Sequence, residues 1–270
     1  MRLHGIFGRP FIDLSPLLDT SVFPALDREI TLGLAGLSLG GTGATLKSMG
    51  VVAPWAMDDG RRDAMEAIRA MRGDELREFV ALGDDPDARP DGGDLAFGDE
   101  TDRPFTLAQQ RLLELRHGVY FPWRDCFHFV ENHRWEDKHS GEGKGFSDEA
   151  LARFPQTCAF IAGLPFTEVG RAVLFGLAPH DHAPLHRDTE PGDALELAQS
   201  INFAPRAGKR FYLQNAPDAA PLVVDRPIYW FNDMDYHGVL ADPFFRYSIR
   251  VDGVFDRAFA REVERLARRG

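Results

Sequence analysis

The stretch RAVLFGLAPHDHAPLHRD, residues 171–188, joins an apolar run to a cluster of histidines and carboxylates. Its first half is rich in the branched and aromatic side chains that favour β-strands. Its second half holds three of the nine histidines of the chain. Neither a strand nor a helix needs such a cluster for its own stability. The cluster therefore indicates a metal or ligand site at the end of a strand.

The part of the chain after Phe166 consists of short β-rich runs separated by turn residues. Strands this short and regular are typical of an antiparallel sandwich or barrel. The runs are RAVLFGLAP, AQSINFAP, KRFYLQN, PLVV, PIYWFN and FRYSIRVDGVF. The sequence therefore predicts a mainly β core, followed by a helix in the last 15 residues, DRAFAREVERLARRG.

Two residues of the cluster, His186 and Asp188, have the spacing at which strand side chains point to one face. An imidazole and a carboxylate on one face can bind the same metal ion. A later strand, in WFNDMDYHGVL, supplies His237 as a third ligand. Two histidines and one carboxylate on one side of a metal leave its other side open, as in non-haem Fe(II) oxygenases.

The next β-rich run carries residues suited to a dicarboxylate cosubstrate such as 2-oxoglutarate. Arg246 follows His237 by nine residues, and an arginine fork can meet a carboxylate with two parallel hydrogen bonds. Ser248 shares its strand face. Arg250 has the same parity and is the weaker alternative or an anchor for the substrate. Tyr212 is a further candidate contact for the cosubstrate.

These segments carry a resemblance to a known family. FPQTCAFIAGLPFTEVGRAVLFGLAPHDHAPLHRD resembles the approach to the first metal ligand in 2-oxoglutarate oxygenases of the aspartyl/asparaginyl β-hydroxylase-like branch, which includes proline cis-hydroxylase-type enzymes. FNDMDYHGVLADPFFRYSIRVDG is similar to the distal histidine and arginine segment of that group. The resemblance covers residues 154–253.

The resemblance implies a double-stranded β-helix (a jelly-roll, cupin-like core) with flanking helices, Fe(II) and 2-oxoglutarate. It implies a dioxygenase that hydroxylates an unactivated C–H bond of an amino acid, peptide or natural product. Aspartyl hydroxylases proper have a glycine where this chain has Asp188. The full carboxylate makes the chain more similar to the amino-acid hydroxylases and argues against halogenation, which needs an open ligand position.

Other interpretations of the same residues stay open. His180 and His182 have the H-x-H spacing of a cupin metal site, although His186-Arg187 stands where a cupin has glutamate. We expect the two histidines instead at the rim of the site, against substrate. Two histidines and a carboxylate also suit hydrolytic zinc, which leaves Arg246 without a role. A non-catalytic metal-binding or ligand-sensing module is the competing class.

The composition excludes several classes of function. The 270 residues carry a formal net charge of −11, which disfavours binding along a nucleic-acid backbone. Two cysteines make no disulfide framework, and free buried thiols are expected. No apolar run is long enough for a membrane span, and the first residues lack a signal-peptide core. These features predict a cytoplasmic protein, and the resemblance implies that its partners are O₂ and a small-molecule, amino-acid or peptide substrate.

The first half of the chain is predicted to be a mixed N-terminal extension, residues 1–150, that packs on the oxygenase core of residues 151–270. Residues 58–82 read as two helices separated by Gly73, and residues 106–118 as a helix with a Thr106–Gln109 capping box. The polar loops 83–104 and 135–149 are expected to cover the open side of the metal. The glycine-rich residues 36–48 match neither the phosphate-loop pattern G-x-x-x-x-G-K-S/T nor the dinucleotide-binding pattern G-x-G-x-x-G. They are expected to form a turn.

Overall fold

The structure is a computed structural model of the chain, and it describes residues 3–37, 64–83, 105–123, 125–130, 138–189, 197–216 and 218–269. The glycine-rich stretch, except for its first two residues, lies outside the described residues. So do residues 84–104 of the first polar loop and residues 135–137 of the second. Within the described part, no helix is long and apolar enough to cross a membrane.

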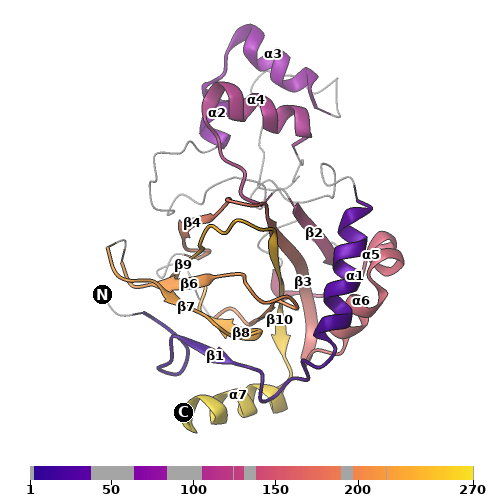
Figure 1. Ribbon diagram of the computed structural model, residues 1–270, viewed down its shortest axis with the longest axis vertical. Helices are drawn as coiled ribbons and strands as arrows, with labels where there is room; N and C mark the ends of the chain where they lie inside the picture. The colour runs from indigo at the N-terminus through magenta and orange to yellow at the C-terminus, as the bar shows by residue number, and fades with distance from the viewer. Residues whose placement is uncertain are drawn as a thin grey trace.

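Ten strands form two antiparallel sheets in the described residues (Figure 1). The larger sheet has the order β1-β8-β5-β10-β3-β2, and the smaller sheet has the order β4-β9-β6-β7. The strands are β1 (Phe11–Asp13), β2 (Asp125–Val130), β3 (Phe166–Leu177), β4 (Ala183–His186), β5 (Ser200–Phe203), β6 (Phe211–Gln214), β7 (Leu222–Val223), β8 (Ile228–Phe231), β9 (Tyr236–Val239) and β10 (Arg246–Phe255).

The order in which the chain visits the sheets defines the fold. From β3 to β10 it alternates between the larger and the smaller sheet, and only the β6–β7 hairpin stays within one sheet. Eight strands wound in this way make a double-stranded β-helix, so the predicted mainly β jelly-roll core is confirmed. The N-terminal half supplies the edges of the larger sheet, because β1 pairs with β8 and β2 pairs with β3.

The two faces of β10 have different surroundings. Tyr247, Ile249 and Val251 belong to the main apolar core, which they share with residues of the helices behind the larger sheet. The alternate residues of β10 therefore face the space between the two sheets. These residues are Arg246, Ser248, Arg250 and Asp252, all buried. A row of buried polar side chains on the inner face of a core strand is unusual, because an ordinary core would be apolar there, and it indicates that the interior carries more than packing.

Seven helices flank the sheets in the described residues: α1 (Phe23–Ala35), α2 (Ala64–Ala70), α3 (Gly73–Ala81), α4 (Leu107–His117), α5 (Asp148–Arg153), α6 (Pro155–Ala162) and α7 (Arg257–Arg269). Figure 1 shows α1, α5 and α6 side by side along the larger sheet, with α2, α3 and α4 gathered at one end of the molecule. Helices α2, α3 and α4 bury a separate apolar cluster that includes Phe79, Phe105 and Leu113.

Local sequence signals account for the helix ends. The Thr106 hydroxyl accepts a bond from the Gln109 amide, the Gln109 side chain accepts from the Thr106 amide, and Gly118 closes α4 at φ 68°. The predicted capping box is therefore confirmed. Pro155 at the first turn of α6 separates it from α5, since proline cannot continue the preceding helix. The predicted C-terminal helix is α7, and the predicted pair around Gly73 is α2 and α3.

Candidate metal centre

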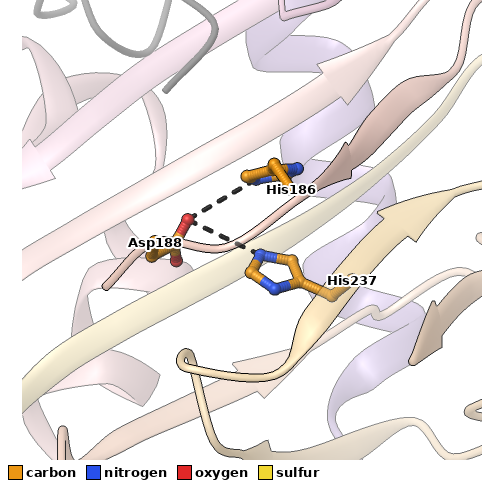
Figure 2. Close-up of side chains that lie close together, drawn as sticks. All are labelled: His186, Asp188 and His237. Carbon is orange, nitrogen blue, oxygen red and sulfur yellow. Dashed lines mark ion pairs between the residues drawn. The ribbon is translucent and has the colours of Figure 1, made fainter. Parts of the chain in front are cut away.

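Three side chains from two strands of the smaller sheet converge in the interior (Figure 2). His186 is the last residue of β4, and it lies directly opposite His237 of β9 in the ladder that joins the two strands. Asp188 follows β4 by two residues, and one oxygen of its carboxylate is turned toward both rings. The ligand atoms of the three residues all lie within 4.8 Å of one another, a set that could hold a metal ion.

The histidine rings are fixed by bonds to the backbone. Nδ1 of His186 lies 2.7 Å from the carbonyl of Pro184, and Nδ1 of His237 lies 2.9 Å from the carbonyl of Asp235. Donation from Nδ1 leaves Nε2 as the free lone pair, which sets both the tautomer and the direction of each ring. The two Nε2 atoms each lie 3.5 Å from Oδ1 of Asp188. The two nitrogens and one oxygen therefore face a common point.

The charge states of the three groups suit metal binding. Burial by itself favours a protonated Asp188, but His237 and Arg250 outweigh it and hold the pKa of this carboxyl well below its ordinary value. Burial, together with the neighbouring His186, lowers the pKa of His237. An ionised carboxylate and a neutral imidazole are the forms that coordinate metals.

Aromatic side chains surround the two imidazoles. Trp123 meets His186 edge-on with ring centroids 5.6 Å apart, and Phe231 meets His237 at 4.8 Å. Trp123 belongs to the segment after α4, so the N-terminal half of the chain reaches a candidate ligand directly. A hydrophobic shell of this kind limits solvent access and lowers the local dielectric constant.

Arg250 lies against the triad. Its Nη1 donates to Oδ2 of Asp188, its Nε donates to Asp252 at 2.8 Å, and its Nη2 lies 3.4 Å from Asp233. Phe231 lies beside the guanidinium, 5.5 Å from its centre. The structure therefore places Arg250 as a partner of Asp188, beside the candidate ligands, and its expected role as a substrate anchor stays a prediction.

A wider set of buried charges continues from Arg250. Lys138 donates to Asp233 at 2.8 Å, and Arg171 pairs with Asp252 at 2.7 Å. Lys138 comes from the second polar loop, which the sequence predicted to cover the metal. The connected set has three carboxylates and three cations, so its formal charge is balanced. We call it the charge network, and its members are Asp188, Asp233, Asp252, Lys138, Arg171 and Arg250.

Arg246 faces the interior as expected, with its two Nη atoms directed at backbone carbonyls and its Nε 3.5 Å from the carboxylate of Asp242. Nη1 donates to the carbonyls of Ala178 and Phe244 at 3.0 and 3.3 Å. Nη2 donates to the carbonyls of Asp181 and Leu240. These bonds tie the loop before β4 to the loop after β9. The structure therefore gives Arg246 the position of a clamp between loops, and its expected role as the anchor of the cosubstrate stays a prediction.

A lysine takes the position beside Ser248. Nζ of Lys209 lies 2.5 Å from Oγ of Ser248 and 3.3 Å from the carbonyl of Phe175 on β3. Burial, with the nearby charge of Arg246, lowers the pKa of Lys209 to about 7. No carboxylate among the described residues pairs with this ammonium. Sequence reasoning missed Lys209, because a lone lysine before a short strand carries no distinguishing pattern.

Three other expected site residues lie away from the triad. Phe211 packs on His237, so the next residue, Tyr212, points to the opposite face of β6. His180 is exposed, and its amide donates to Asp242. His182 stacks on Tyr120, with ring centroids 5.4 Å apart, at the far end of β4 from Asp188. The structure does not bring these three residues together with the candidate ligands.

Comparisons with known proteins add little to this geometry. No protein-family model matches the chain, and no curated protein is significantly similar to it. Among solved structures, an oxidoreductase of the 2OG-Fe(II) oxygenase family from Burkholderia pseudomallei matches 47% of this chain and 66% of its own, with 12% identity and a TM-score of 0.30. A prolyl-4-hydroxylase from Pseudomonas putida matches 39% of this chain and 62% of its own, with 18% identity and a TM-score of 0.25.

The chain thus spans less than two thirds of either solved structure. At these TM-scores the likenesses do not bear on the fold, which rests on the order of the strands. What the described residues establish is a double-stranded β-helix whose interior holds a His-Asp-His group able to bind a metal.

Proposed function

We propose that this protein is an Fe(II)- and 2-oxoglutarate-dependent oxygenase that hydroxylates an unactivated C–H bond of an amino acid, a peptide or a natural product. The observation that carries the proposal is the convergence of His186, Asp188 and His237 on one point of the interior. The rest of the site is consistent with it in donor chemistry, in charge and in the shape of the fold.

The donor set fits Fe(II). Two imidazole nitrogens and one carboxylate oxygen lie on the same side of the common point, with both rings oriented by backbone carbonyls. This is the ligand type and arrangement of non-haem Fe(II) oxygenases, which need open positions opposite the protein ligands. In the proposal, Nε2 of each histidine and Oδ1 of Asp188 bind the metal.

The inner face of β10 fits a dicarboxylate beside the metal. Ser248 and Arg250 are two residues apart on the strand, a separation of about 7 Å. Arg250 contacts Asp188, so the Lys209–Ser248 pair lies roughly the length of a small dicarboxylate from the metal position. In the proposal, this pair holds the far carboxylate of 2-oxoglutarate, and Arg246 shapes the wall behind it.

Charge balance supports a dianionic cosubstrate. The charge network is neutral as it stands, so a bound divalent cation leaves two uncompensated positive charges inside the protein. An uncompensated buried charge is costly, and a dianion removes the excess. The ammonium of Lys209, which has no carboxylate partner in the described residues, is a further positive charge that favours a bound anion.

The protein's own residues supply position and protection. Bound Fe(II) with 2-oxoglutarate and O₂ supplies an oxidant for the C–H bond, with the oxygen atoms ending in the hydroxylated product and in succinate, and CO₂ released. Trp123 and the aromatic rings around the imidazoles exclude water from the chamber. The loop that carries Lys138 and the segment that carries Trp123 form the side from which a substrate is positioned.

Succinate formation tests the proposal. The protein is incubated anaerobically with Fe(II) and 2-oxoglutarate, air is admitted, and succinate is measured with and without pools of amino acids and peptides. We expect slow succinate formation without substrate and a rise with the right pool. His237→Ala serves as the matched inactive control. No succinate above that control, together with no effect of 2-oxoglutarate on the melting temperature of the Mn(II) form, excludes the oxygenase and leaves a metal-binding module.

A further inference from the structure

The carboxylate of Asp188 has its two oxygens in different environments. Oδ1 faces the Nε2 atoms of His186 and His237 at 3.5 Å each. Oδ2 accepts a hydrogen bond from Nη1 of Arg250. A carboxylate can bind a metal through one oxygen or through both. To bring Oδ2 onto the metal as well, the group must rotate and break its bond with Arg250.

Arg250 is itself held in place. Its Nε donates to Asp252, which has no exposed surface and is gripped from the other side by Arg171. Its Nη2 faces Asp233, which Lys138 also holds. The backbone amide of Asp188 donates to the carbonyl of Asp233 at 3.0 Å. The guanidinium therefore cannot follow Asp188 if the carboxylate turns, because two further carboxylates fix its other nitrogens.

We propose that Arg250 is a positioning residue that restricts Asp188 to one metal bond and so keeps an extra coordination position open for exogenous ligands. The inference rests on the proposed function in that it takes the triad as the metal site. With one bond from each of three residues, an octahedral metal has three positions left. Two are needed to chelate a keto acid and one for O₂. A second bond from Asp188 removes the last of these.

The chain offers a variant that tests this role with little other disturbance. The side-chain nitrogen of glutamine stands at the same number of bonds from the backbone as Nε of arginine. Arg250→Gln can therefore keep the bond to Asp252 while it loses both Nη atoms and releases Asp188. Asp233 keeps Lys138, and Asp252 keeps Arg171. Arg250→Lys retains a cation that can reach Asp188 and is the conservative rescue.

The readout is the number of water molecules on bound Mn(II). Broadening of the Mn(II) electron paramagnetic resonance lines in ¹⁷O-enriched water counts them without any cosubstrate or turnover. We expect three waters in the wild type, two in Arg250→Gln and three in Arg250→Lys. We also expect Arg250→Gln to bind Mn(II) about tenfold more tightly or better, because a positive charge near a dication is removed and a donor atom is gained.

Arg171→Gln is the matched control. It makes the same chemical change in the same charge network, at a residue that pairs with Asp252. We expect three waters in this variant. Two waters in Arg171→Gln as well, or three in Arg250→Gln whatever its affinity, overturns the inference. If Arg250→Gln does not fold, the same measurement is made on the double variant Arg250→Met, Asp233→Asn, which removes one positive and one negative charge. We expect this variant to lose one water from bound Mn(II) as well.

The result also separates the inference from the proposed function. If the wild type binds no Mn(II), or binds it equally well after His186→Ala, the triad is not the metal site and the proposed function fails with it. If the triad binds Mn(II) but the water count does not respond to Arg250→Gln, the proposed function stands. The guanidinium is then only a structural part of the charge network.

Discussion

His186 and His237 stand directly opposite each other in the β4–β9 ladder, with ring centroids 4.3 Å apart. They are 51 residues apart in the chain (237 − 186), and they are brought together by the pairing of β4 with β9, whose register shifts between Ala183 and His186. Side chains alternate between faces with a period of two, and a slip of one residue would turn one ring away. The candidate metal centre is therefore a consequence of strand register.

Removing one imidazole should abolish metal binding at the triad. His186→Ala or His237→Ala leaves two protein ligands of three, and even the loss of a supporting partner commonly costs 10- to 100-fold in affinity. We expect calorimetric titration with Mn(II) to show a loss of about 100-fold or more. His180→Ala is the control, because this histidine is exposed and lies outside the triad. Wild-type affinity in both ligand variants would remove the assignment.

The ladder that aligns the two histidines depends on Gly238. A Cβ atom at this position would lie 2.8 Å from the Ala183 carbonyl and 2.7 Å from the Tyr212 hydroxyl. Gly238→Ala should therefore push β4 and β9 apart and lower the unfolding free energy by about 1–3 kcal/mol. It should also weaken metal binding, because the two histidines lie on these strands. Gly145→Ala has no atom within 4 Å of the added carbon and should leave both unchanged. Thermal melts and Mn(II) titrations of the pair provide the comparison.

The anchor for 2-oxoglutarate should be Lys209 and not Arg246. Lys209→Met removes a cation that has no carboxylate partner in the described residues. A hydrogen bond to a charged group contributes ~2 kcal/mol, so we expect 2-oxoglutarate to bind the Mn(II) form about 30-fold more weakly. Arg246→Met should instead lower the unfolding free energy by about 3 kcal/mol, because it releases two loops from a buried clamp. The reverse pattern would return the anchor role to Arg246.

Binding of 2-oxoglutarate should weaken as the pH rises through neutrality. The pKa of Lys209 is lowered to about 7, mainly by burial and further by Arg246. A carboxylate ligand requires the protonated ammonium, so its affinity is full below that pKa. Above it, the affinity falls by about tenfold per pH unit until the higher pKa of the complex is reached. Titrations of the Mn(II) form over about pH 7 to 9 measure the slope.

Lys209→Arg is the control for that slope. A guanidinium stays protonated over this range, so its affinity for 2-oxoglutarate should not change with pH. An equal slope in Lys209→Arg and the wild type would mean that another group titrates.

Periodicity and local signals predicted much of the architecture. The shared parity of Arg246, Ser248 and Arg250 follows from strand geometry alone, and these side chains do face the interior. The two-residue spacing of His186 and Asp188 predicted that they meet, although β4 ends at His186 and Asp188 lies in the bend that follows. The Thr106 cap follows from a single turn of helix. Each signal depends only on residues a few positions apart, which is why each can be read from sequence.

The ends of long side chains could not be predicted in the same way. Strand parity sets the face from which Arg246 leaves β10, but its guanidinium turns to carbonyls of two loops whose paths are set by the tertiary structure. Lys138 reaches Asp233 across 95 positions, from a loop whose composition is typical of a solvent-exposed turn. Tyr212 shows the same limit, since a shift of one position along β6 decides which face it joins.

The segment before β1 is tied to the far end of the chain. The amides of His4 and Gly5 donate to the carboxylate of Asp235, two residues before His237, and Phe11 of β1 pairs with Phe231 of β8. During synthesis these early residues leave the ribosome long before their partners exist. They must wait unpaired, or held by a chaperone, while more than 200 residues are added. A metal ion can therefore meet all three candidate ligands only after β9 has been made and has paired with β4, and this pairing also presents Asp235 to the waiting N-terminal amides.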